Sequence, residues 1–184
     1  MKITNAGRKS AAVMAAIAIV ALGGQAHAID NGGGTGGTTP PIECKTGMVY
    51  DADKKICVQA EAGVLDDEQL YEQGRVLALA GRYGEALTAL GAVVDKDDAM
   101  VLTMIGFAKR KSGALAEGIA LYHQALAFEP DNLNTLEYLG EGYVASGEMG
   151  LAVTQLHKLK TLCGPDCDQY QQLATVISGG ANWQ

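Results

Sequence analysis

Two cysteines near the end of the chain have a spacing that could support redox chemistry. Cys163 and Cys167 enclose Gly-Pro-Asp, one residue more than a Cys-Gly-Pro-Cys redox motif, in which the start of a helix lowers the pKa of a thiol. No strand-like run precedes the pair, as the corresponding redox fold would require. We interpret the two cysteines as a structural disulfide, and thiol-disulfide exchange through them stays an alternative function.

The histidines and the densest run of carboxylates predict neither a metal site nor a catalytic centre. His123 and His157 lie 34 residues apart, and no carboxylate or cysteine stands beside both at ligand spacing, which indicates solvated surface residues. Asp95, Asp97 and Asp98 lack the glycine and the distal glutamate of a calcium loop and indicate a solvated turn. Without a Ser-His-Asp set or a phosphate-binding glycine loop, we expect no enzyme, no metal and no cofactor.

The first 28 residues have the layout of a secretory signal peptide. Basic residues stand at positions 2, 8 and 9, an apolar run covers residues 11–22, and Ala26-His27-Ala28 supplies the small residues of a cleavage site. The run is shorter than the roughly 20 residues that span a bilayer, and no later segment approaches that length. We therefore expect a bacterial periplasmic or secreted protein, soluble after cleavage and without a transmembrane segment.

The charge of the chain excludes polyanions as natural partners. Cleavage after residue 28 removes three of the 14 Lys and Arg residues and none of the 21 Asp and Glu residues, so the net charge falls from −7 to −10. Nucleic-acid binding normally needs a basic patch that displaces counterions, and the sequence shows none. Anionic membrane surfaces are disfavoured for the same reason.

Four cysteines follow the expected cleavage site, at Cys44, Cys57, Cys163 and Cys167. An even number of cysteines in an oxidising compartment indicates disulfides, and three pairings are formally possible. The pairs 44 with 57 and 163 with 167 are local in sequence and close the smallest loops. We predict these two disulfides and no free thiol.

A linker and a small hairpin are expected before the main folded part. Residues 29–41 are dominated by Gly and Thr and cannot bury enough apolar surface to fold, so they predict a flexible linker. Within residues 42–60, two strand-like runs at 48–50 and 56–58 flank a turn-rich stretch, which predicts a hairpin. A disulfide would have to stabilise such a small segment.

The hairpin has a second possible role. Its Cys-X-X-Gly-X-Val-aromatic-Asp start, from Cys44 to Asp51, and its Cys57-Val58 end resemble short exported cysteine modules. The resemblance implies binding to a glycan or to the cell envelope as an alternative function, and a disulfide-stabilised spacer is the competing interpretation.

From residue 64 the pattern becomes helical and repeats. Gly81, Gly113 and Gly147 follow each other at 32 and 34 residues, each at a turn between two helices, where glycine can end a helix in the left-handed conformation. The pattern resembles the tetratricopeptide repeat, a unit of two antiparallel helices. The resemblance covers residues 67–98, 99–132 and 133–166, and it is carried by Leu70, Gly74, Leu77, Tyr83, Ala86, Leu90, Leu102, Gly106, Tyr122, Ala125, Pro130, Leu136, Leu139, Gly140, Tyr143, Ala152 and Leu156.

We therefore predict an all-α fold, a short solenoid of three tetratricopeptide units at residues 64–178 that ends in a capping helix. A repeat array exposes an apolar end that needs a cap, and residues 167–178 carry the apolar Leu173, Val176 and Ile177 for that purpose. Asp166 with Gln169 three residues later predicts a capping box at the start of this helix. Residues 179–184 should form a flexible tail.

The resemblance to this family also implies a binding surface, because the first helices of tetratricopeptide units form a concave groove for a protein or peptide. Phe107 should be an exposed apolar anchor flanked by Arg75, Arg110 and Lys111, which suits a partner segment with an apolar residue between acidic ones. We expect an exported protein-interaction module, with envelope assembly as one setting and a homodimer as one state. The groove positions are Tyr71, Arg75, Leu79, Met100, Thr103, Phe107, Arg110, Lys111, Asn134, Glu137 and Glu141.

Overall fold

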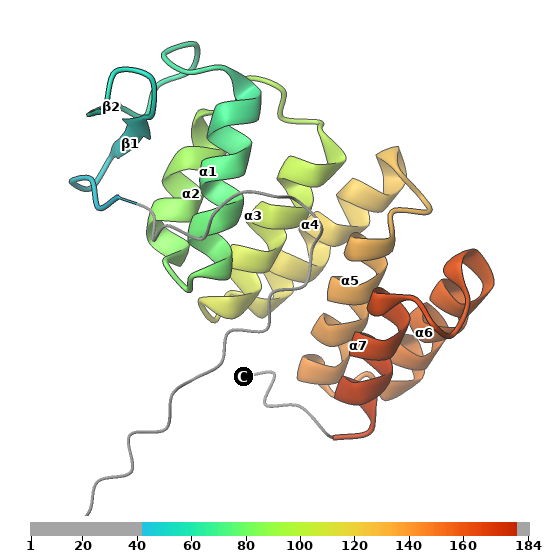
Figure 1. The fold of residues 1–184 in the computed structure, drawn as a ribbon. Coiled ribbons are helices and arrows are strands. Elements are labelled where there is room, and N and C mark those ends of the chain that lie inside the picture. Colours follow the sequence, from blue (N-terminus) through green and yellow to red (C-terminus); the bar gives the residue numbers. More distant parts are fainter. Residues whose placement is uncertain (1–41, 180–184) are drawn as a thin grey trace, which may run out of the picture. The chain divides into compact units, whose positions relative to one another are not determined.

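The structure is a computed structural model that describes residues 42–179, and the predicted signal peptide, the whole predicted linker and residues 180–184 of the predicted tail lie outside these residues. A short antiparallel hairpin comes first, with β1 at Met48–Asp51 and β2 at Ile56–Gln59. Seven helices follow within the described part of the chain, and Figure 1 shows their arrangement. Their bounds are α1 Asp67–Leu79, α2 Tyr83–Ala92, α3 Ala99–Lys111, α4 Leu115–Phe128, α5 Leu133–Ser146, α6 Met149–Cys163 and α7 Asp168–Ile177.

The helices form three pairs and a final single helix, as the repeat pattern predicts. α1 packs on α2, α3 on α4, and α5 on α6, while α7 packs on both α5 and α6. Each pair is joined by a tight turn in which Gly81, Gly113 or Gly147 has a positive φ of 77°, 100° or 81°. The left-handed backbone at these positions suits glycine, because a Cβ atom would add strain there.

The first helix of each pair begins with a side-chain cap. Asp66 accepts a hydrogen bond from the N–H of Gln69, Asp98 from those of Met100 and Val101, and Asn132 from that of Thr135. These carboxylate and amide oxygens satisfy N–H groups that would otherwise lack partners at the helix start. The second helices have no such cap and emerge directly from the glycine turns.

The N-cap of α7 differs from the sequence prediction. Cys167 is the N-cap residue, the helix starts at Asp168, and no side chain makes a capping hydrogen bond. The prediction of a capping box from Asp166 and Gln169 is therefore wrong. Gln169 instead donates a 2.8 Å hydrogen bond from Nε2 to Oδ1 of Asn134 on α5, which ties α7 to the third pair.

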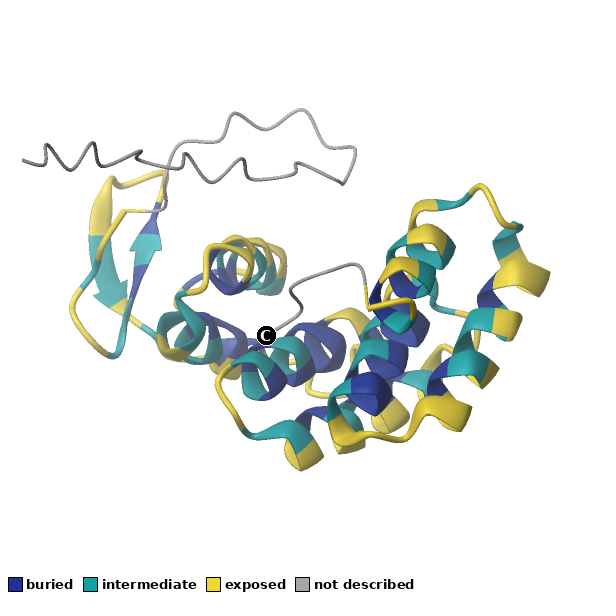
Figure 2. Ribbon diagram, turned by 90° about the horizontal axis from the view of Figure 1, so that it is seen from below, coloured by how far each residue is buried: buried dark blue, intermediate teal, exposed yellow. Residues whose placement is uncertain are grey.

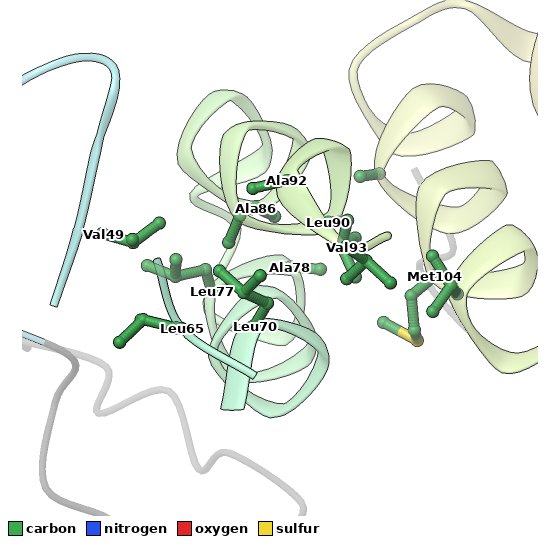
Figure 3. Packing of buried hydrophobic residues seen from close by; sticks show 13 residues of the cluster. Val49, Leu65, Leu70, Leu77, Ala78, Ala86, Leu90, Ala92, Val93 and Met104 are labelled. Atoms are coloured by element: carbon green, nitrogen blue, oxygen red, sulfur yellow. The ribbon is translucent and has the colours of Figure 1, made fainter. Parts of the chain in front are cut away.

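The core runs between the helix layers, and the exposed residues lie on their outer surfaces (Figure 2). At the N-terminal end, Val49 of β1 and Leu65 of the following loop point toward Leu70 and Leu77 of α1 (Figure 3). Val49 is only 2% exposed, so the hairpin contributes to the core of the first pair. Burying a valine side chain stabilises a fold by roughly 1.5–3 kcal/mol.

Both predicted disulfides are present. Cys44 is bonded to Cys57 and Cys163 to Cys167, and the described residues include no free cysteine. Along residues 42–179, none of the helices is both long enough and apolar enough to cross a bilayer.

Candidate partner-binding surface

The contacts between helices define an inner and an outer face of the repeat array. α1 contacts α3, α3 contacts α5, and α5 contacts α7, whereas α2, α4 and α6 do not contact one another. A row of elements that touch lies on the inside of a curve, and a row of elements that spread apart lies on the outside. The first helices therefore form the inner face, on which the family resemblance placed the binding residues.

A cleft of about 430 Å³ opens between α1 and α3. Tyr71 on α1 and Met100 on α3, both predicted binding residues, line this cleft together with Val93 and Val101. Met100 is 46% exposed, so its apolar side chain is accessible to a partner in the cleft. The size of the cleft lies within the range of ligand pockets in proteins.

The rim of this cleft is acidic. Its remaining lining residues are Asp67, Glu68, Glu72, Asp95 and Asp98. The Asp67 carboxylate accepts hydrogen bonds from the N–H groups of Val94, at 2.8 Å, and Asp95, at 3.0 Å. These two bonds lower the pKa of Asp67, so this carboxylate is firmly ionised at neutral pH.

Phe107 is not the exposed anchor that the sequence predicts. Its side chain is half-buried and packs against the N-terminal core. The ring lies edge-on to Tyr83 of α2, with centroids 6.4 Å apart, and 5.1 Å from the ring of Tyr138 on α5. Phe107 thus links three helix pairs as part of an aromatic row, because its position on α3 turns toward the neighbouring helices.

The sequence predicts Arg110 to be a basic residue exposed in the groove, but its side chain is buried. The residue is only 6% exposed, and its guanidinium forms an ion pair with Glu141 of α5 and donates a 3.3 Å hydrogen bond to the hydroxyl of Tyr122. The guanidinium carbon also lies 5.7 Å from the centre of the Phe107 ring. Arg110 and Glu141 therefore hold α3 against α5, and they present no free charge to a partner.

Two further predicted groove residues are buried between helices. Thr103 and Thr135 share a 2.6 Å hydrogen bond between their hydroxyls, which joins α3 to α5. Glu137 is 3% exposed, and its pKa is raised to about 8, mainly by burial and then by the neighbouring Glu141. Neither Thr103 nor Glu137 is open to a partner.

The other predicted residues remain at the surface. Arg75 is half-buried and pairs with Glu72 at 2.9 Å, and Lys111 is half-buried at the end of α3. Leu79, at 54% exposure, and Asn134 are exposed. The predicted groove residues therefore include Tyr71 and Met100 in the cleft between α1 and α3, whereas Thr103, Arg110 and Glu137 are buried between helices.

A residue that the sequence analysis did not single out for binding fixes the hairpin in place. Gln73 of α1 accepts a 2.9 Å hydrogen bond from the N–H of Tyr50 and donates a 2.8 Å bond to its carbonyl oxygen. The side-chain amide thereby acts as one more partner on the edge of β1. Gln73 stands at a position of the repeat that is usually apolar, and this substitution was the sign in the sequence that its side chain has a polar partner. Together with the burial of Val49, this contact makes the hairpin a cap on the first pair.

The histidines of the outer face and the aspartates of the turn before α3 lie at the surface. His123 and His157 are exposed on α4 and α6, and Nε2 of His123 lies 2.9 Å from the hydroxyl of Tyr143. Asp95, Asp97 and Asp98 are exposed, and Asp98 serves as a helix cap. Between residues 42 and 179, no three His, Cys, Asp or Glu side chains gather closely enough to hold a metal ion.

Comparisons with known proteins identify the fold. No protein-family model matches the sequence, and no curated protein matches it significantly. Two crystal structures of MamA superpose with TM-scores of 0.52 and 0.51 at 21% identity, covering 64% and 62% of this chain and 71% and 64% of theirs. A third structure, MamA MSR-1 C2, gives a TM-score of 0.50 at 31% identity and covers 62% of this chain and 68% of its own. The chain thus has an all-helical repeat fold of the tetratricopeptide type, similar to that of MamA.

Proposed function

We propose that this protein is an exported interaction module that binds a segment of a partner protein on its inner face. The observation that carries the proposal is the cleft between α1 and α3, which is lined by Tyr71 and the exposed Met100. Exposed apolar side chains inside a concave surface are typical of sites that bind another protein. The fold similarity to MamA supports a protein-binding role in general.

Export is part of the proposal. The predicted signal peptide lies outside the described residues, and the support comes from the two disulfides. Disulfides persist in oxidising compartments such as the bacterial periplasm and are rare in the cytosol. Such a location would be compatible with a place in an envelope assembly.

A photo-crosslinking experiment tests the proposal. Benzoylphenylalanine placed at Met100 on the inner face, or at Asn134 further along it, should capture the partner in cells of the source organism. The same group at the exposed His157 on the outer face should not. Mass spectrometry of the crosslinked product identifies the partner. Capture of the same protein from position 157 and not from position 100 would move the binding surface to the second helices and refute the proposal.

A further inference from the structure

The lining of the cleft between α1 and α3 contains five carboxylates, and their charge bears on which partner segment fits it. The inference drawn from this charge rests on the proposed function. We propose that the cleft binds a partner segment in which a lysine or arginine side chain adjoins an apolar one. This partner is opposite in charge to the acidic segment that the sequence alone suggests, because the structure withdraws Arg110 from the surface and opens the cleft where the carboxylates lie.

The cleft is lined by carboxylates and by no cation. Asp67, Glu68, Glu72, Asp95 and Asp98 line it, and none of its lining residues is a lysine or an arginine. Of these five, only Glu72 forms a salt bridge within residues 42–179, with Arg75.

The nearest lysine in the sequence does not neutralise the rim by contact. Lys96 directs its ammonium group to the backbone carbonyls of Gly91, at 2.6 Å, and Val93, and acts on Asp67 without touching it. Backbone N–H groups donate hydrogen bonds to Asp67 and Asp98, which holds these carboxylates in place and stabilises their ionised forms, and within the described residues neither forms a salt bridge. The cleft therefore has a net negative potential before any partner arrives.

The apolar part of the cleft lining argues for a side chain with an apolar part. Tyr71, Val93, Met100 and Val101 supply carbon surface in the same cleft as the carboxylates. Tyr71 is half-buried in the lining of the cleft, and the face of an aromatic ring attracts cations. Lysine and arginine combine a long apolar stem with a charged head, which matches a cleft lined by both carbon surface and carboxylates.

The same features exclude two other occupants. A metal ion needs several ligands converging on one point, and within the described residues these carboxylates do not form such a group. Nucleic acid and anionic lipid would be repelled by the rim. A basic segment of a protein is the class of partner that the cleft fits.

Binding of two labelled peptides tests the inference directly. The first probe is a fluorescein-labelled peptide with two arginines between leucines, and the second has glutamates in place of the arginines. Fluorescence anisotropy should show binding of the first probe, weakening as salt is added, and no binding of the second. Stronger binding of the glutamate peptide, or equal binding of both, would overturn the charge preference.

Matched variants show whether the peptide uses the cleft. Glu68→Lys with Asp95→Lys should weaken the arginine peptide about tenfold or more, and Met100→Ala should weaken it several-fold. Glu61→Lys with Glu148→Lys makes the same change of net charge at exposed positions outside the cleft, and Met149→Ala matches Met100→Ala at a similar exposure of 42%. Both controls should bind within about twofold of the parent. If the control variants lost as much affinity for the arginine peptide as the cleft variants, the peptide would be held only by the overall charge of the protein, and the site would be refuted.

Methyl spectra of the parent chain avoid any effect of substitution on folding. With methionine methyl groups labelled with ¹³C, the arginine peptide should shift the signal of Met100 and leave that of Met149 unchanged. A shift at Met149 alone would refute the site.

The crosslinking experiment separates this inference from the proposed function. If the natural partner is captured from position 100 and the charge variants bind it normally, the basic-segment inference fails and the proposed function stands. If the partner is captured only from the outer face, the function itself fails.

Discussion

The side chain of Glu137, a predicted groove residue, is buried between helices. It lies on α5 with Arg110 of α3, Glu141 of its own helix and Asp168 of α7 among the charged groups that act on it. Burial dominates, and it raises the pKa of Glu137 to about 8, so the folded protein holds a proton that the unfolded chain releases. Arg110 forms an ion pair with Glu141 and not with Glu137. Its positive charge therefore stabilises the ionised form of Glu137 less than burial and Glu141 destabilise it.

Glu137 should make the stability of the folded protein depend on pH. An unfolded glutamate has a pKa of about 4.3, and the folded value is about 8. Between these values the folded state binds more protons, so the contribution of Glu137 to the free energy of unfolding falls as pH rises and is constant outside this window. Glu137→Gln should remove that slope and stabilise the protein at pH 8 by about 1–3 kcal/mol.

Urea denaturation of the parent and Glu137→Gln at several pH values measures this difference. Glu141→Gln serves as the contrast, since it leaves the buried Arg110 without its carboxylate and should destabilise by about 3 kcal/mol. A parent and a Glu137→Gln variant whose stabilities differ by the same amount at all pH values would contradict the assignment.

Two glycines of the second helices give opposite expectations for the same substitution. At Gly118, a Cβ atom would lie 2.7 Å from the carbonyl oxygen of Gly106 and 2.8 Å from Cβ of Arg110, whereas at Gly150 it would meet nothing within 4 Å. Gly118→Ala should therefore destabilise by about 1–3 kcal/mol, and Gly150→Ala should stabilise by roughly 0.5–1 kcal/mol. Thermal unfolding followed by circular dichroism checks both, and a stable Gly118→Ala would show that α3 and α4 can separate at no cost.

At the scale of elements, the third helix pair is completed by the capping helix. In the first two pairs, Gly74 faces Leu90 and Gly106 faces Tyr122, each a residue of the second helix of the same pair. In the third pair, a Cβ atom at Gly140 would lie 2.4 Å from Leu173 of α7. Leu173 is fully buried, so α7 supplies core to the third pair as well as covering it.

A double-mutant cycle tests this contact between α5 and α7. Gly140→Ala alone should destabilise by about 1–3 kcal/mol by pushing against Leu173, and Leu173→Ala alone by about 2–5 kcal/mol by leaving a cavity. Together they should cost less than the sum, because the new methyl group occupies part of the space that the leucine leaves. Strictly additive losses in denaturant titrations would show that the two positions do not touch.

The elements themselves could be predicted from the sequence, and their side-chain environments only in part. Gly81, Gly113 and Gly147 end helices through a local backbone requirement, and the disulfides join cysteines close in sequence, so local information was enough. The partners of Phe107, Arg110 and Gln73 come from other helices or from the hairpin, and their positions depend on how the elements cross. Family position therefore placed Phe107 and Arg110 on the correct helix and gave them the wrong exposure.

At the scale of the whole molecule, the two disulfides lie in the terminal segments of the described chain and none joins one helix pair to another. Reduction should therefore lower stability and leave most of the helical signal in circular dichroism intact. The chain-entropy model gives about 3 kcal/mol for the 13-residue separation of Cys44 and Cys57 and about 2 kcal/mol for the 4-residue separation of Cys163 and Cys167. Peptide mapping without reduction that found a link between Cys44 and Cys163 would contradict this arrangement.

The hairpin and α7 also decide how copies of this protein can assemble. Stacking one array on the next would require an open apolar end. Val49 and Gln73 hold the hairpin against the first pair, and Leu173 packs α7 against the third. The exposed residues at these ends include the polar Lys54, Lys55, Gln171 and Thr175, and the hairpin also exposes the apolar Ile56. The hairpin and α7 therefore cover the first and third helix pairs, which disfavours direct stacking of one array's helices on the next.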